Sequence, residues 1–129
     1  MSADLELQKA IFARLSSDAA LVALVGARIH DNPPADVAHP YLTLGESETR
    51  DWPAGMEHRL ALHCFTRGGG RAEAKAILEA VRSSLHDTAL ALETRALVNL
   101  RFLDAQTRRE ADGLTWRGTI RLRAVTEEV

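Results

Sequence analysis

Histidine and cysteine are the side chains best suited to metal or nucleophilic chemistry, and their spacing in this chain offers no site for either. His58 and His63 lie five residues apart on a predicted strand, so they point to opposite faces and cannot easily share an ion. Cys64 follows His63 directly, and neighbours on a strand also face opposite ways, whereas a Cys–His nucleophile needs hydrogen-bond contact. We therefore interpret Cys64 as a small buried apolar residue and assign no catalytic, cofactor-binding or metal-binding residue.

Three further polar features have simpler structural interpretations. Gly68-Gly69-Gly70 precedes a predicted helix, whose first amides could bind phosphate, but neither phosphate-binding motif is present and a hinge is favoured. His86 ends that helix and is interpreted as a cation at its C-terminus. Several carboxylates surround one polar segment, which favours a solvated arm over an acid/base pair; these are Glu46, Glu48, Asp51 and Glu57. No enzymatic activity is expected.

Tryptophan and arginine form the stronger candidate for a binding surface. Trp52 lies in a polar segment beside Arg50, with Met56 nearby, and Trp and Arg are enriched in interface hot spots. Trp52 is either an anchor for a neighbouring subunit or a side chain that folds back over the sheet edge. A set of arginines shares one face of the last two predicted strands, where it either pairs with acids of a neighbouring subunit or is solvated. These are Arg101, Arg117, Arg121 and Arg123.

The overall composition is that of an ordinary globular domain. The chain has 129 residues, a net charge of -2 and a pI of about 6.2. General nucleic-acid binding usually requires a basic domain, so no sequence-specific nucleic-acid partner is expected. Cys64 is the only cysteine, which favours a reducing compartment. No run of about 18 apolar residues occurs, so no membrane partner is expected.

Apolar spacing predicts the helices. Residues 4–16 carry Leu7, Ile11 and Leu15 on one helical stripe, with Asp4 as the expected N-cap. A second, short helix follows, with Asp18 as its N-cap and Gly26 as its end. The most regular helix runs over residues 71–86. These segments are expected to pack on a sheet.

Alternating or mixed apolar segments predict strands over residues 28–30, 41–46, 57–66 and 97–108, and a last, strictly alternating strand over residues 115–124. Residues 47–56 are polar and form either a long loop or an extended hairpin arm. Strands with few crossover helices imply a largely antiparallel sheet, with the two main helices packed on one face. The predicted fold class is therefore α+β.

The two last strands should form a C-terminal hairpin. A three-residue loop Ala111-Asp112-Gly113 places Phe102 opposite Leu122 and Leu100 opposite Ala124, so apolar residues meet. A two-residue turn would instead place Arg123 opposite Phe102. The favoured register also sets Arg123 against Arg101, which costs stability unless an acid lies nearby.

In this order, these elements resemble the tail-completion, or tail-terminator-like, family of long-tailed phages and gene transfer agents. The resemblance covers nearly the whole chain, residues 1–129, as one domain. The residues that carry it lie in four groups. They are Leu15, Asp18, Leu21, Leu24, Val25, Gly26, Arg28 and Ile29; Pro40, Tyr41, Leu42 and Gly45; the helix from Ala74 to Leu85; and Asp112, Gly113, Leu114, Thr115, Gly118, Arg123 and Ala124.

The resemblance implies a structural subunit that forms a ring, with six copies as the expected number. Its implied partners are further copies of itself, the tail tube protein and the head–tail connector protein, and DNA can pass through the lumen. It implies a place in the tail of a phage-like particle, assembled in the bacterial host cytoplasm. The alternatives are another head–tail connector or tube subunit, or a small cytoplasmic ligand-binding domain or enzyme.

Overall fold

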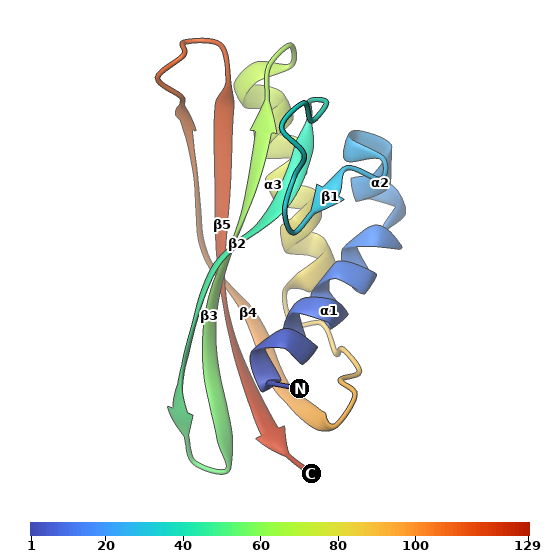
Figure 1. Cartoon of the computed structure of the whole chain (residues 1–129), viewed down its shortest axis with the longest axis vertical. Coiled ribbons are helices and arrows are strands. Elements are labelled where there is room, and N and C mark those ends of the chain that lie inside the picture. Colours follow the sequence, from blue (N-terminus) through green and yellow to red (C-terminus); the bar gives the residue numbers. More distant parts are fainter.

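The computed structural model describes all residues, 1–129, and arranges them as one sheet with helices on one of its faces (Figure 1). The helices are α1 (Ala3–Ser16), α2 (Ala19–Val25) and α3 (Gly70–Leu85). The strands are β1 (Ile29–His30), β2 (Tyr41–Trp52), β3 (Gly55–Thr66), β4 (Arg95–Arg109) and β5 (Trp116–Glu128). None of the helices is long and apolar enough to cross a membrane.

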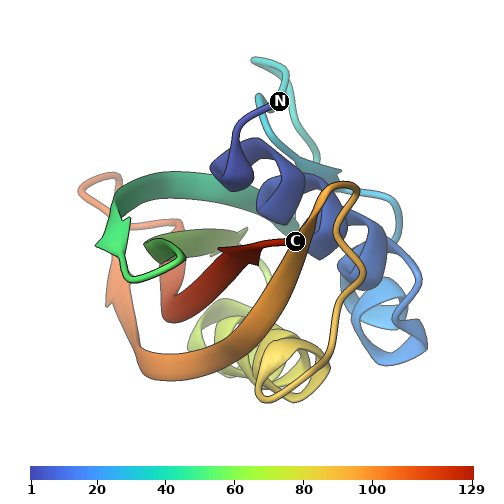
Figure 2. The same ribbon diagram turned by 90° about the horizontal axis from the view of Figure 1, so that it is seen from below.

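The sheet is antiparallel except at one short edge. Its strand order is β1-β2-β3-β5-β4, and only β1 pairs in parallel, with β2. Figure 2 shows that the long strands curve strongly along their length. The predicted α+β class, the helices on one face and the C-terminal hairpin are all confirmed.

One hydrophobic core lies between the helices and the sheet. The predicted stripe of α1 is buried, and so is the apolar face of α3. They pack on apolar residues of the strands, which alternate with polar ones as the period of two requires. The core includes Leu7, Ile11, Leu15, Ile77, Val81, Leu62, Leu100, Ile120, Leu122 and Ala124.

The start of α1 differs from the prediction, whereas α2 agrees with it. Ser2 is the N-cap of α1, and its hydroxyl accepts a hydrogen bond from the Leu5 amide at 3.1 Å. Asp4 lies in the first turn, where its carboxylate contacts Ser47 on β2 and His58 on β3. The carboxylate of Asp18 does cap α2, because it accepts from the Leu21 amide at 3.0 Å. Ser2 and Asp4 are both residue types that favour the N-cap, so the sequence left the first boundary ambiguous.

His86 also has a role other than the expected one. Its Nδ1 atom accepts a hydrogen bond from the Phe102 amide at 3.0 Å, and an accepting ring nitrogen carries no proton. The ring therefore acts here as an acceptor that joins the end of α3 to β4, and not as a cation. Its Nε2 atom lies 3.2 Å from the carboxylate of Asp87.

The polar segment 47–56 is an extended hairpin arm and not a loop. Its tip lies beyond the start of α1 in Figure 1. Trp52 pairs with Gly55 across a two-residue turn, Pro53-Ala54. A Cβ atom on Gly55 would lie 1.8 Å from the carbonyl oxygen of Thr126, so only glycine lets β5 approach the arm.

The C-terminal hairpin has the predicted central register but a longer loop. Phe102 faces Leu122 and Arg101 faces Arg123, as expected. The loop has four residues, 111–114, because the Glu110 amide donates to the Thr115 carbonyl at 2.8 Å. The predicted three-residue loop is therefore wrong by one residue. A β-bulge at Leu103 absorbs the difference and restores the register in the centre of the sheet.

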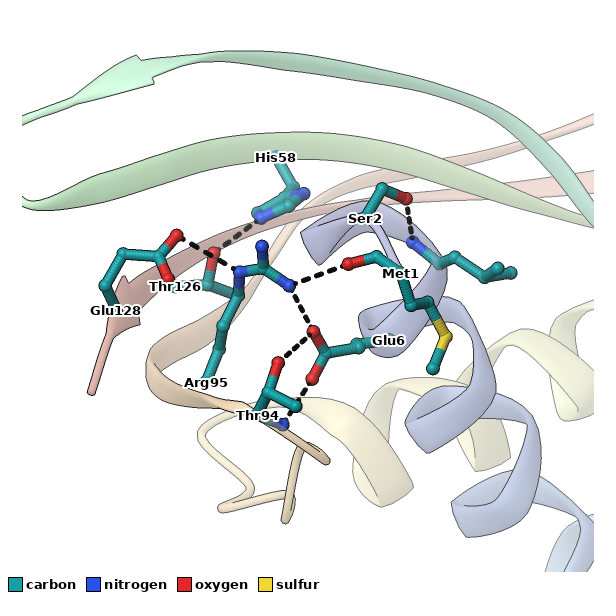
Figure 3. A network of polar contacts seen from close by, with 9 residues as sticks. Met1, Ser2, Glu6, His58, Thr94, Arg95, Thr126 and Glu128 are labelled. Carbon is teal, nitrogen blue, oxygen red and sulfur yellow. Dashed lines mark hydrogen bonds and ion pairs between the residues drawn. The ribbon is translucent and has the colours of Figure 1, made fainter.

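A buried carboxylate fastens α1 to the far end of the sheet (Figure 3). Glu6 is 2% exposed and accepts hydrogen bonds from the Thr94 amide at 2.6 Å and the Thr94 hydroxyl at 2.8 Å. Arg95 also contacts Glu6 and lies 3.2 Å from Glu128 at the end of β5. The backbone hydrogen bond from Thr94, with the contacts of Arg95, lowers the pKa of Glu6. This network was not predicted, because its partners are far apart in the sequence.

Candidate functional site

The face of the sheet opposite the helices, here called the outer face, carries most of the predicted interface residues. Strand alternation and the observed pairing place Arg123 beside Arg59 on β3 and Arg101 on β4, in one row across the sheet. Arg121 and Arg117 follow along β5 on the same side. The predicted arginine face is therefore one continuous surface that no helix covers.

Each of the four arginines that were predicted for this face contacts an acid of its own chain. Arg123 lies 2.6 Å from Glu57, and Arg121 lies 3.3 Å from Asp104. Arg117 and Arg101 are farther from their acids, at 3.5 Å from Glu110 and 3.7 Å from Asp87. The like-charge pair of Arg101 and Arg123 is thus offset by two acids, as stability requires.

Glu57 and Arg123 make the closest of these contacts. Their side chains are 11% and 22% exposed, so water screens the pair less than it screens the exposed pairs around it. The hydrogen bond from Arg123 lowers the pKa of Glu57, with further lowering by Arg59 and Arg50. The carboxylate is therefore held in its charged form beneath the arm.

Trp52 lies at the tip of the arm on the outer face. The Cζ atom of Arg123 lies 5.0 Å from the centre of its ring, which is a cation–π distance. The side chain remains 41% exposed. Arg50 is on the same face and lies 2.8 Å from Glu48. Met56 does not join them, because it pairs with Asp51 and so points to the other side of the arm.

A shallow groove of about 370 Å³ crosses the outer face from β2 to β4. Glu46 and Glu48 line it on β2, and Asp104 and Arg121 line it on the opposite side. His63 lies between Glu46, at 2.7 Å, and the hydroxyl of Thr119, at 2.8 Å. From the sequence, Glu46 and Glu48 were interpreted only as part of a solvated arm, and Asp104 was not considered. The signal that could have found them is their position on alternate residues that face the arginines.

The residues considered for chemistry are placed apart from one another. Cys64 is fully buried, and burial raises the pKa of its thiol to about 11, so the thiol stays protonated near neutral pH. His63 points to the outer face and His58 to the core, where His58 lies 2.9 Å from the hydroxyl of Thr126. Gly69 is the N-cap of α3 without a side-chain hydrogen bond.

Comparison with known proteins identifies the family of the chain. Residues 9–127 match the family described as Tail completion protein gp17. No curated protein matches the chain. A solved chain from a structure described as "Virion of native gene transfer agent (GTA) particle" is 35% identical, with a TM-score of 0.86 over 94% of this chain and 94% of that one.

A second solved chain shares the fold. It aligns with a TM-score of 0.67 over 100% of this chain and 98% of its own, at 15% identity. That likeness concerns architecture alone. The family match and the chain from the particle together show that this chain belongs to the tail completion protein gp17 family and is a structural protein of a phage-type tail.

Proposed function

We propose that this chain is a tail terminator: six copies form a closed ring that caps the head-proximal end of the tail tube and joins it to the head connector. The observation that carries the proposal is the alignment with a virion chain over 94% of both chains. A subunit with this role acts by shape and contact, since it ends tube growth and presents a joining surface. We place its assembly in the bacterial host cytoplasm.

The outer face and the arm are the surfaces we assign to contacts between subunits. Residues 47–52 of β2 form one side of the arm and span about 20 Å, which would let the tip reach a neighbouring copy. Its tip presents a half-exposed tryptophan, the residue type that most often dominates interface energies. In the ring, five arginines of the outer face would pair with acids of the neighbouring copy, in place of or in addition to the acids of their own chain. These are Arg50, Arg101, Arg117, Arg121 and Arg123.

The long free edge of β4 supports the same proposal. β4 pairs with β5 on one side only, although it has 15 residues. Proteins usually cover or interrupt such an edge, and here two bulges interrupt it, at Val98 and Leu103. Both of these apolar residues are exposed, at 51% and 41%. A neighbouring subunit against this edge would remove them from water.

Native mass spectrometry over a concentration series tests the proposal, first with the purified chain and then with tail tube protein added. A closed species of six copies, alone or on tube ends, is the expected result. Open-ended growth would instead identify a tube subunit, because a heterologous contact that does not close produces filaments. A monomer that also fails to bind tube ends and head connector would contradict the proposal.

A further inference from the structure

Three arginines at one end of the molecule differ from all the others. Arg71 is in the first turn of α3, and Arg108 and Arg109 end β4. All three side chains are exposed, and none contacts a carboxylate or donates a hydrogen bond within the chain. Every other arginine contacts an acid or hydrogen-bonds to an oxygen of the chain.

Trp116 holds two of these guanidinium groups in place. The Cζ atoms of Arg71 and Arg109 lie 4.6 Å and 5.2 Å from the centre of its ring. Trp116 itself begins β5 opposite Arg109 and lies close to Gly70 at the start of α3. Cation–π contacts of this kind restrict the rotamers of a long side chain without using its N–H donors. The guanidinium N–H donors of Arg71 and Arg109 are thus held in place but make no hydrogen bond within the chain.

Some carboxylates at this end of the molecule already have partners within the chain. The carboxylate of Asp112 accepts hydrogen bonds from the amides of Leu114 and Thr115 and from the Thr115 hydroxyl. Glu110 lies beside Arg117. The remaining acids are Glu73, in the first turn of α3, and Asp36, which lines a pocket with Arg67 and Asp112. In Figure 1 this end combines the β4–β5 turn with the start of α3, away from both chain termini.

We propose that this arginine end, made by Arg71, Arg108 and Arg109, binds the phosphate backbone of DNA. The inference rests on the proposed ring, since a ring around the DNA path would present one end of each subunit to the duplex. Guanidinium groups match phosphate geometry, and three exposed groups on two elements suit an extended polyanion. Contacts to phosphate do not read the base sequence. The net charge of -2 makes such binding weak, and the phosphate contacts make it sensitive to salt.

Fluorescence anisotropy with a labelled 30-base-pair duplex tests this, from 50 to 200 mM salt. The test variant is Arg71→Gln/Arg108→Gln/Arg109→Gln. The control, Arg14→Gln/Arg59→Gln/Arg82→Gln, removes the same charge from arginines that already have partners in the chain. We expect the test variant to lose about tenfold or more in affinity at 50 mM salt, and its log–log salt slope to fall by up to about 2.7. The control should lose less and keep its slope.

Folding and assembly are scored on the same samples. Arg108 makes no aromatic contact, so Arg108→Gln alone should lower the salt slope by about 0.9 even if the triple variant is destabilised. Equal losses in the two triple variants would overturn the proposal. Equally strong Arg-dependent binding of polyglutamate would also overturn it, in favour of an acidic protein partner. Native mass spectrometry reports the ring separately: a ring without Arg-dependent binding contradicts the DNA contact alone. A chain that forms no ring and binds neither tube ends nor head connector contradicts the proposed function.

Discussion

Arg123 and Glu57 lie 2.6 Å apart across the central strand pair β3–β5, and the same guanidinium lies 5.0 Å from the ring of Trp52. Arg123 therefore contacts both Glu57 at the base of the arm and Trp52 at its tip. This contact connects the stability of the arm to the proposed assembly.

Trp52→Ala should weaken ring assembly more than folding. Truncation of an interface anchor typically costs about 2 kcal/mol or more, or roughly 30-fold in affinity. The side chain is 41% exposed in the single chain, so only part of it is buried on folding, and we expect folding to lose about 1–2 kcal/mol, less than a dominant interface anchor contributes. Native mass spectrometry and thermal unfolding measure the two effects. Met56→Ala is the matched control on the other side of the arm, and unchanged assembly with a lowered Tm would make Trp52 a local packing residue.

Glu57→Gln should lower the Tm, because it leaves Arg123 beside Arg101 with less compensating charge. The loss should be larger at low ionic strength, where like charges repel over longer distances. Glu48→Gln, which removes an exposed acid from the same face, is the control and should change the Tm little. A Tm loss independent of salt would show that Glu57 acts through packing and not through charge.

Two neighbouring substitutions in the arm turn should have opposite signs. Ala54 has φ of 66°, which glycine adopts without strain, so Ala54→Gly should stabilise the chain by about 1 kcal/mol. Gly55→Ala should destabilise it by about 1–3 kcal/mol, because the added methyl meets the backbone of Thr126. Urea unfolding of both variants measures the difference. If both changes have the same sign, the turn geometry is not the one described.

Acid should remove the contribution of Asp112 at the β4–β5 loop. Hydrogen bonds from the Thr115 and Leu114 amides lower the pKa of this carboxyl to about 2 from an ordinary 3.8. A lowered pKa stabilises the fold above the ordinary value, and this stabilisation is lost as the pH falls from about 4 through about 2. Asp112→Asn should therefore show a smaller loss of stability than the unaltered chain over this window, measured by urea unfolding. Parallel pH profiles would contradict this role.

The central register of the C-terminal hairpin could be predicted from the apolar pattern of the sequence. Apolar matching correctly paired Phe102 with Leu122, although the loop was predicted one residue too short. The extra loop residue follows from hydrogen bonds of the Asp112 side chain, and the bulge at Leu103 compensates for it. Core burial decided the register, and the loop and the bulge adjusted to it.

Periodicity alone determined the helices, most of the strand segments, the α+β class and the arginine face, because these depend on residues a few positions apart. Only the tertiary structure decided which side chains, far apart in the sequence, contact one another. Glu57 and Arg123 are 66 positions apart, and Glu6 and Arg95 are 89 positions apart. The same applies to the free arginines, since only the fold shows which side chains lack an acid within reach. Pairing between distant residues depends on how the strands curve and where bulges lie, and no local pattern encodes either.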